Sequence, residues 1–351
     1  MWYGIGVWFR NLLFDIGLKK QVSPSVTTIG VGNLCVGGAG KTPHVEYLLR
    51  MLSQQYTTAM LSRGYGRSTR GFLKDDGTHD ASLLGDEPAM IARKFPHVQV
   101  AVCEKRVEGI HQLMAQDNPP QLVVMDDTFQ HRFIKPTINI LLTEYGKPYY
   151  TDYILPFGNL REGRGARYRA GIVIVTKSPA DLNPIDRHNI TNSLRLQPYQ
   201  KAFFSHLHYP DPVAMQSHGT LRLTSQHKVL LVTGIAHPEE LASHIRQICS
   251  VTLLSFPDHH RFSPSDIKRI RKAYEHLGEG ECVVMTTEKD ASRLHPFVER
   301  GDLEGIPLYC QPIEVRMIQS KDYNFDQSIG NIVSENILFQ HRMQNAKFQS
   351  L

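Results

Sequence analysis

A glycine-rich segment that ends in a lysine and a threonine is the part of this sequence best suited to bind phosphate. Residues 37–42 have the sequence GGAGKT, and they lie between a β-branched run at 26–31 and an apolar helical pattern. Glycines let backbone N–H groups converge on phosphate oxygens, and the N-terminus of the following helix adds positive potential. Lys41 would reach the β- and γ-phosphates, and the Thr42 hydroxyl would ligate Mg²⁺. The residues predicted to bind a nucleoside triphosphate are therefore Gly37, Gly38, Ala39, Gly40, Lys41 and Thr42.

The loop departs from the common P-loop pattern at its beginning. That pattern has a glycine five residues before its second glycine, and Cys35 occupies this position. Extra glycines follow at Gly37 and Gly38. Because a strand precedes the loop and a helix follows it, the segment is interpreted as a variant P-loop and not as a chance glycine-rich turn.

A second candidate for metal chemistry follows the apolar run at 121–125. Asp126 and Asp127 come directly after this run, which is typical of a buried strand. An acidic residue at the end of such a strand places a carboxylate beside the metal of a P-loop. Adjacent aspartates point in different directions, so the sequence leaves open which of them ligates Mg²⁺. Gln130 and His131 would lie on the same rim and contact substrate.

The first twenty residues combine aromatic and apolar side chains with flanking cations. They lack the basic start and the cleavage site of a signal peptide, and Arg10, Asn11 and Asp15 interrupt the apolar run that a transmembrane helix needs. On a helix the apolar residues form one face, and both tryptophans of the chain lie in this segment. The pattern is typical of an amphipathic helix in a membrane interface. A helix packed on the protein's own core is the alternative.

Composition describes a folded chain with a modest excess of positive charge. The 351 residues are 41% hydrophobic and 21% charged, with a net charge of +5. This excess suits an anionic membrane surface, a phosphorylated substrate or a nucleic acid. Aromatic-plus-basic tracts of the RNA-binding kind are missing, so we expect no nucleic-acid partner. The five cysteines are scattered and never form a CxxC pair, which argues against a zinc site or a disulfide framework.

Short apolar strands alternate with helical patterns over the first half of the chain. The expected strands are 26–31, 58–61, 98–101, 121–125, 139–142 and 172–176. This alternation predicts an α/β fold with a mostly parallel sheet, like that of P-loop NTPases, covered on both faces. A second series of strands and helices begins at 228 and indicates a second, smaller α/β domain. The expected division is an amphipathic helix at 1–22, a P-loop domain at 23–209, a linker at 210–227, the smaller domain at 228–340 and a frayed tail at 341–351.

Several spaced motifs resemble one known family. In chain order they are VGNLCVGGAGKTP at 31–43, LSRGYGR at 61–67, GDEP at 85–88, VVMDDTFQHR at 123–132, GNLRE at 158–162, VTKSP at 175–179, FPDHHRF at 256–262 and TTEKDASRL at 286–294. Together they are similar to the tetraacyldisaccharide 4′-kinases of lipid A biosynthesis, a family of the P-loop NTPase superfamily. Family members typically have threonine or serine at the position of Cys35, so the loop of this chain would rely on its backbone cradle.

The resemblance implies an activity and a location. The family transfers the γ-phosphate of ATP, with Mg²⁺, to the 4′-hydroxyl of a tetraacylated glucosamine disaccharide 1-phosphate. It works at the cytoplasmic face of the inner membrane of Gram-negative bacteria, as a peripheral enzyme on an anionic surface, and no obligate protein partner is expected. Two domains would face each other across a cleft. From the residues alone, two alternatives stay open: a P-loop kinase with a soluble small-molecule acceptor, and a non-catalytic nucleotide-binding switch.

The resemblance also assigns roles to charged residues outside the P-loop. Asp86 would accept the proton of the attacking hydroxyl, and a histidine of the DHH run would orient it, with His259 favoured over His260. Arg161 would contribute charge at the phosphates, and Glu162 would act at the metal or its waters. The catalytic set is thus Asp86, His259, Lys41 and Arg161, and the substrate candidates are Arg63, Arg67, Glu87, Arg106, Gln130 and His131.

Simpler structural explanations remain open for several of these residues. Asp86 and Glu87 would also suit the first turn of a helix, where the macrodipole favours acids. The arginines at 63 and 67 could belong to a solvated basic loop, and the Arg–Glu pair at 161–162 could be a local ion pair.

Overall fold

The chain forms two compact α/β units. The computed structural model describes residues 2–278, 282–319 and 324–349. Unit 1 consists of Met1–Leu207 and Val315–Leu351, and unit 2 of His208–Glu314. Unit 2 is therefore an insertion in the chain of unit 1.

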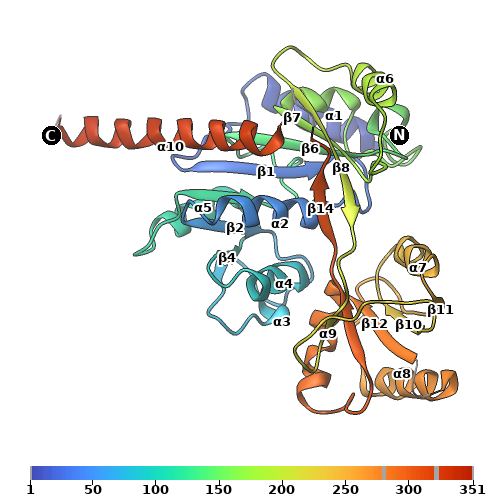
Figure 1. Ribbon diagram of the computed structural model, residues 1–351. Coiled ribbons are helices and arrows are strands. Elements are labelled where there is room, and N and C mark those ends of the chain that lie inside the picture. Colours follow the sequence, from blue (N-terminus) through green and yellow to red (C-terminus); the bar gives the residue numbers. More distant parts are fainter. Residues whose placement is uncertain (1, 279–281, 320–323, 350–351) are drawn as a thin grey trace. The chain divides into compact units, whose positions relative to one another are not determined.

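Unit 1 is built on a sheet of nine strands in the described part of the chain (Figure 1). These strands are β1 (Thr27–Asn33), β2 (Thr58–Ser62), β3 (Leu73–Lys74), β4 (Gln99–Val102), β5 (Leu122–Met125), β6 (Ile138–Glu144), β7 (Ile172–Thr176), β8 (Lys201–His208) and β14 (Glu314–Met317). Their order is β14-β8-β7-β6-β1-β5-β2-β4-β3. The pairings from β8 to β4 are parallel, and β3 is antiparallel to β4.

Both faces of this sheet are buried, as its continuous apolar strands predict. In β5, Leu122 and Val124 belong to one core, while Val123 and Met125 belong to another on the opposite face. Alternate residues of a strand point to opposite faces, so each strand contributes to both cores. The described helices of unit 1 are α1 (Trp2–Asp15), α2 (Lys41–Leu52), α3 (Ala81–Leu84), α4 (Asp86–Lys94), α5 (Arg106–Met114), α6 (Pro184–Leu194) and α10 (Phe325–Gln349), with short 3₁₀ turns at Tyr149–Thr151 and Arg164–Arg169.

Helix α10 brings the end of the chain back to unit 1 and runs alongside β1 (Figure 1). Phe325, Ile329, Val333 and Ile337 recur every four residues and therefore lie on one face of the helix. All four are buried in the same core as α2 and α4. The first strand and the last helix of the chain thus share one hydrophobic core.

Unit 2 is a smaller α/β unit with its own two cores. Its sheet has the order β11-β10-β12-β13-β9. The strands are β9 (Val213–Ala214), β10 (Lys228–Thr233), β11 (Ser250–Ser255), β12 (Cys282–Thr287) and β13 (Leu308–Gln311). The helices are α7 (Pro238–Arg246), α8 (Pro264–Leu277) and α9 (Glu288–Glu299).

The structure corrects three of the expected boundaries. Residues 315–340, expected in the smaller domain, belong to unit 1, because β14 joins its sheet and α10 its core. The expected linker at 210–227 contains β9, which pairs with β13, so it is part of unit 2. The expected tail at 341–351 continues α10 as far as Gln349. Residue 1 of the expected N-terminal helix and residues 350–351 lie outside the described residues.

Polar residues of helix α1 (Trp2–Asp15) contact the rest of unit 1. Arg132 donates to the carboxylate of Asp15 (2.7 Å) and to the carbonyl oxygen of Asn11 (2.9 Å). Trp2 and Trp8 are 87% and 63% exposed, and Phe14 is buried. The helix is thus held by polar contacts and by the buried ring of Phe14, while both tryptophans stay exposed. Among the described residues, no helix is both long and apolar enough to cross a membrane.

Candidate functional site

The candidate site lies where the central strands of the unit 1 sheet end. Strand β1 pairs with β5 on one side and with β6 on the other. After β1 the chain continues on the β5 side of the sheet, and it later returns to the β6 side. Ligands of open parallel sheets bind beyond the carboxyl ends of the strands at such a switch point. The topology therefore brings the P-loop at 37–42 and the segment 126–131 together.

The P-loop has the backbone of an anion cradle. Gly37 and Gly40 have φ angles of 110° and 78°, which residues with side chains rarely adopt. A Cβ added to Gly37 or Gly38 would meet no described atom within 4 Å, so this face of the loop is open. Gly40 precedes α2, and within the described chain no side chain caps that helix and no acid occupies its first turn. Its N–H groups and its positive end are therefore available to phosphate.

Two cations flank the carboxylate of Asp127 beside this loop. Lys41 Nζ lies 3.4 Å from Asp127 Oδ1 and 3.2 Å from Asn33 Oδ1. Arg161 Nη1 lies 3.2 Å from Asp127 Oδ2. A φ of 46° at Asp127 turns its backbone sharply after β5. Lys41 and Arg161 are thus brought together at one carboxylate, and their expected contact with the phosphates of a nucleotide stays a prediction.

The donor set at this edge fits Mg²⁺. Burial opposes the ionisation of Asp127, but Lys41 and Arg161 outweigh it and lower the pKa of the carboxyl group. Asp126 is buried at the end of β5, and Thr42 is buried in the first turn of α2. Within the described residues, no group of three or more His, Cys, Asp or Glu side chains is placed to hold a metal alone. Mg²⁺ typically takes one or two carboxylates and completes its shell with waters and phosphates, so two aspartates and a hydroxyl suffice.

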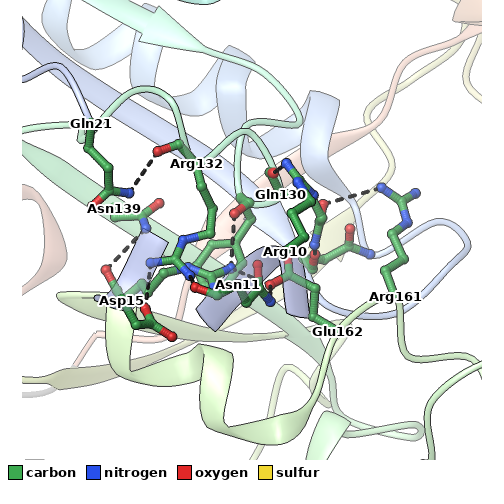
Figure 2. A network of polar contacts seen from close by, with 12 residues as sticks. Arg10, Asn11, Asp15, Gln21, Gln130, Arg132, Asn139, Arg161 and Glu162 are labelled. Atoms are coloured by element: carbon green, nitrogen blue, oxygen red, sulfur yellow. Dashed lines mark hydrogen bonds and ion pairs between the residues drawn. The ribbon is translucent and has the colours of Figure 1, made fainter. Parts of the chain in front are cut away.

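Helix α1 is joined to this site by hydrogen bonds (Figure 2). Arg10 donates to the carbonyl oxygen of Gln130 (2.8 Å), and the Tyr3 hydroxyl donates to the carbonyl oxygen of Arg161 (3.2 Å). Gln130 in turn donates from Nε2 to the carbonyl oxygen of Asn33 (2.8 Å) at the end of β1. Gln130 therefore links α1 to the strand that leads into the P-loop.

Glu162 lies beneath α1. Its Oε2 atom accepts hydrogen bonds from Asn11 Nδ2 (2.8 Å) and from Arg169 Nη2 (2.9 Å), and the residue is 1% exposed. The alternative of a local pair between neighbours is wrong, because Glu162 pairs with Arg169 while Arg161 pairs with Asp127. The second oxygen, Oε1, is buried without a hydrogen-bond partner among the described residues. Glu162 thus anchors α1 with one oxygen, while the other has no hydrogen-bond partner among the described residues.

The three arginines expected at the substrate have different surroundings. Arg63 is exposed just after β2. Arg67 pairs with Glu104 (2.6 Å) and donates to the carbonyl oxygen of Gly71 (2.6 Å), so it holds the loop that follows β2. Arg106 is 2% exposed and donates to the carbonyl oxygens of Cys103 (2.6 Å) and Asp126 (3.2 Å).

The substrate roles expected for Arg67 and Arg106 stay predictions, because both side chains already make contacts within the protein. The described contacts of Arg67 and Arg106 stabilise loops at the edge of the sheet. The sequence alone does not distinguish an arginine that makes such contacts from an arginine that is open to a ligand. Burial lowers the pKa of Arg106 to about 10, which still leaves it charged beneath the two aspartates. Arg63 is the one of the three whose exposure suits a substrate contact.

His131 lies on the rim beside Gln130. Burial, together with Arg106, Arg10 and Arg63, lowers the pKa of His131 to about 4. The ring is therefore neutral at neutral pH and can exchange hydrogen bonds with an uncharged group.

Asp86 and Glu87 open α4, next to the arginine-containing loop. Gly85 precedes them with a φ of 97°, and a Cβ there would meet the carbonyl oxygen of Tyr65 at 2.9 Å. The GDEP turn is thus packed closely against the loop that follows Arg63. Both acids occupy the first turn of the helix, as expected.

The two histidines of the DHH run in unit 2 have different environments. His260 stacks on Phe256, with ring centroids 4.8 Å apart, and its Nε2 atom lies 3.0 Å from Asp266 Oδ2. His259 is exposed and has a φ of 58°. Because its ring is not packed in this way, His259 fits the expected role better. Its pairing with Asp86 stays a prediction, since the two residues belong to different units.

A histidine that the sequence did not single out lies directly under the P-loop. His44 is 3% exposed, with Nδ1 2.7 Å from the carbonyl oxygen of Gly40 and Nε2 2.9 Å from Ser205 Oγ. A carbonyl oxygen can only accept, so Nδ1 carries the proton and Nε2 accepts from the serine hydroxyl. His44 therefore connects the P-loop to β8. The sequence offered no signal for this contact beyond a histidine in the first turn.

Protonation of His44 is expected to destabilise the fold below neutral pH. Burial lowers its pKa from 6.5 to about 4, so between these values the unfolded chain binds a proton that the folded chain does not. Stability is therefore lost as the pH falls through this window, by about 3 kcal/mol for this residue. Urea unfolding of wild type and His44→Gln at a series of pH values would measure the effect. The glutamine variant should have the flatter dependence, and parallel curves would refute the assignment. His131 adds an effect of the same sign in both proteins.

A family model described as tetraacyldisaccharide-1-P 4′-kinase matches residues 1–333 of the chain. The chain belongs to the tetraacyldisaccharide 4′-kinase family. A tetraacyldisaccharide 4′-kinase of Bacteroides fragilis (strain YCH46) is 43% identical over 348 residues, which cover 95% of this chain and 91% of that protein. One from Flavobacterium johnsoniae is 40% identical over 337 residues, covering 95% of each chain.

A solved structure of the tetraacyldisaccharide 4′-kinase family resembles the fold over nearly its whole length. It is the crystal structure of the "apo" form of LpxK from Aquifex aeolicus in complex with ATP, with a TM-score of 0.73 and 26% identity. The match covers 95% of this chain and 96% of that one. The predicted family, the α/β fold class and the assignment as a kinase are thereby confirmed.

Cys35 gives the tetraacyldisaccharide 4′-kinase P-loop of this chain an uncharged thiol. Burial, with Asp152 and Glu144, raises the pKa of Cys35 to about 11 against the opposing effect of Arg161. Cys35 forms a β-bridge with Leu160, next to Arg161. The backbone at Cys35 thus joins the P-loop segment to the segment that carries Arg161, and this bridge does not depend on the cysteine side chain.

The sequence analysis did not identify Asn33, which ends β1 beside Lys41 in this tetraacyldisaccharide 4′-kinase site. Its side chain accepts from Lys41 and donates to the carbonyl oxygen of Cys35 (2.7 Å). A signal was present, since a polar residue at the end of a buried strand next to a P-loop rarely serves the core alone.

Proposed function

We propose that this chain transfers the γ-phosphate of ATP to the 4′-hydroxyl of a tetraacylated glucosamine disaccharide 1-phosphate. The observation that carries the proposal is the attachment of α1, whose exposed aromatic side faces outward, to the rim of a P-loop through Arg10 and Tyr3. A phosphate donor site joined directly to a membrane-seeking helix suits an acceptor that lies in a membrane. A soluble acceptor would need no such helix.

The donor side of the reaction would be built by the P-loop. Gly37, Gly38, Ala39, Gly40, Lys41 and Thr42 would bind ATP. Thr42 with Asp126 or Asp127 would hold Mg²⁺, and the free oxygen of Glu162 supports a contact with a water of the metal shell. When bound, Mg²⁺ neutralises charge on the phosphate oxygens. Lys41 and Arg161 would stabilise the negative charge that develops during transfer, because both already lie around one carboxylate.

The acceptor side would use residues at the neighbouring strand ends. The oxygen of the 4′-hydroxyl attacks the γ-phosphorus, the bond to the β–γ bridging oxygen breaks, and the hydroxyl proton passes to the Asp86 carboxylate. His259 would orient Asp86. Arg63, Glu87, Gln130 and His131 would contact the sugar or its 1-phosphate.

The chain would act at the cytoplasmic face of the inner membrane as a peripheral protein. Trp2, Trp8 and Phe9 are more than half exposed on α1, and Lys19 and Lys20 follow the helix. Aromatic side chains favour the interface, and the lysines complement anionic lipid head groups.

Mass spectrometry of lipids after incubation with the protein tests this function. With ATP, Mg²⁺ and the disaccharide 1-phosphate in anionic vesicles, the lipid should gain the mass of one phosphate. No gain in mass would refute the proposal. A variant with Trp2→Ser and Trp8→Ser should sediment less with the vesicles and phosphorylate the embedded lipid more slowly. If the variant and the wild type phosphorylated the embedded lipid at equal rates, the kinase activity would still hold, but α1 would have no role in reaching the membrane.

A further inference from the structure

The motif at 286–294 (TTEKDASRL) has no role in the site described so far, yet it lies against the DHH run of unit 2. Asp290 is fully buried in the first turn of α9, where its backbone N–H is capped by Thr287. Its Oδ2 atom accepts from the backbone N–H of Gly234 (2.9 Å), and Oδ1 accepts from Arg293 Nη1 (2.9 Å). A buried carboxylate that accepts several hydrogen bonds is held in one position within unit 2.

Two sets of contacts lead from Asp290 to His259. In the first, Arg293 spans from Asp290 to the ring of His259, where Nη2 lies 3.2 Å from Nδ1. In the second, the carbonyl oxygen of Gly234 accepts from both Arg293 Nη1 (3.1 Å) and the backbone N–H of His259 (3.1 Å). Both the ring and the backbone of His259 are thus held by the same residues. These contacts support a backbone with a φ of 58°, which costs free energy in a residue with a side chain.

The contact with Arg293 decides which ring nitrogen carries the proton. A guanidinium group is always a donor, so His259 Nδ1 must accept. In the neutral imidazole the proton then resides on Nε2, the nitrogen at the far end of the ring. A ring in this tautomer can donate a hydrogen bond from Nε2 to a carboxylate. In His260 the Nε2 atom lies 3.0 Å from Asp266 Oδ2, so the ring of that histidine is held by a carboxylate within unit 2.

We infer that Arg293, fixed by Asp290, is a positioning residue that holds His259 as the Nε2–H tautomer and so presets its ring as a hydrogen-bond donor from Nε2. The inference rests on the proposed pairing of His259 with Asp86. In this proposal Arg293 acts through His259.

A double-mutant cycle on the full-length enzyme tests this role. Arg293→Met, His259→Ala and the double variant are assayed for lipid phosphorylation, with kcat and the KM for ATP determined separately. Arg300→Ala serves as the control, because Arg300 caps the same helix and pairs with Asp302 (3.0 Å) away from His259. Arg293→Met should lower kcat on the order of 10-fold to 100-fold, the range typical when the partner that orients a functional histidine is lost. The KM for ATP should not change.

Measuring Arg293→Met in the His259→Ala variant distinguishes a positioning role of Arg293 from a general structural role. If Arg293 acts through His259, Arg293→Met should cost less than about twofold in kcat once His259 is alanine, because the two residues act as a unit. An equal loss in both backgrounds would overturn the inference, as would an unchanged kcat in the single variant.

Nitrogen NMR of His259 gives a readout that does not depend on activity. The wild-type ring should show a proton on Nε2 alone, and Arg293→Met should show a mixture of tautomers. A wild-type proton on Nδ1 would overturn the inference whatever the kinetics. By contrast, full activity of His259→Ala would refute the proposed pairing with Asp86, and with it the catalytic purpose given to Arg293, while the kinase activity itself would stand.

Discussion

Replacing Lys41 with methionine is expected to lower kcat for lipid phosphorylation by about 10²- to 10³-fold, the usual cost of losing one electrostatic contact to the transition state. Lys41 Nζ lies within 3.4 Å of Asp127 and 3.2 Å of Asn33, so its position is fixed before any nucleotide arrives. Methionine keeps most of the length of the side chain and removes the charge. Affinity for ATP, measured by calorimetry, should weaken as well.

Lys201→Met provides the matched control for this variant. Lys201 is exposed at the first residue of β8, and in a parallel sheet the strands begin at the edge opposite the one at which they end. Its loss should leave both kcat and ATP affinity within about twofold, because exposed charges far from a site contribute little. If Lys41→Met also stayed within twofold, the P-loop would not be the donor site.

Replacing Asp86 with alanine is expected to abolish most phosphate transfer while ATP still binds. General-base catalysis contributes about 10²- to 10⁴-fold, and kcat should fall by an amount in that range. Asp86 begins α4, whereas the P-loop precedes α2, so the nucleotide contacts are untouched. Calorimetry with ATP and mass spectrometry of the lipid product would measure the two effects separately.

Asparagine at the same position distinguishes a base from a first-turn acid. Asp86→Asn keeps the size of the side chain and one acceptor oxygen, and losing the charge in the first turn of α4 should cost only about 0.3–1 kcal/mol. It cannot accept the proton. We therefore expect Asp86→Asn to be nearly as stable as wild type in thermal unfolding but as inactive as the alanine variant. Wild-type turnover in either variant would exclude Asp86 as the base.

The parts of the site that could be predicted from sequence are those whose partners are consecutive in the chain. The P-loop at 37–42 is recognisable because strand, glycines, Lys41–Thr42 and helix follow one another directly. Asp126 and Asp127 could be predicted for the same reason, since they end a continuous apolar strand. The resemblance to the kinase family then linked these segments across the chain.

Contacts between distant segments could not be predicted in this way. Glu162 was expected at the metal, but Asn11, which binds it, is 151 residues away in sequence. Nothing local distinguishes Arg63, which is exposed, from Arg67, which is paired with Glu104. In the same way, the spacing of Phe325 and Ile329 predicts a helix but not the sheet on which it packs. For this reason residues 315–340 were assigned to the wrong unit.

Because unit 2 is inserted in the chain of unit 1, unit 1 cannot finish folding until the residues that follow unit 2 have been translated. The P-loop is synthesised early, and domains commonly fold as units while the chain is still being made. Here the core beneath the P-loop lacks Phe325, Ile329, Val333 and Ile337 until the first half of α10 has left the ribosome. Unit 2 is complete in the chain before then and can fold first. Maturation of the nucleotide site thus depends on a segment that is synthesised after the whole of unit 2.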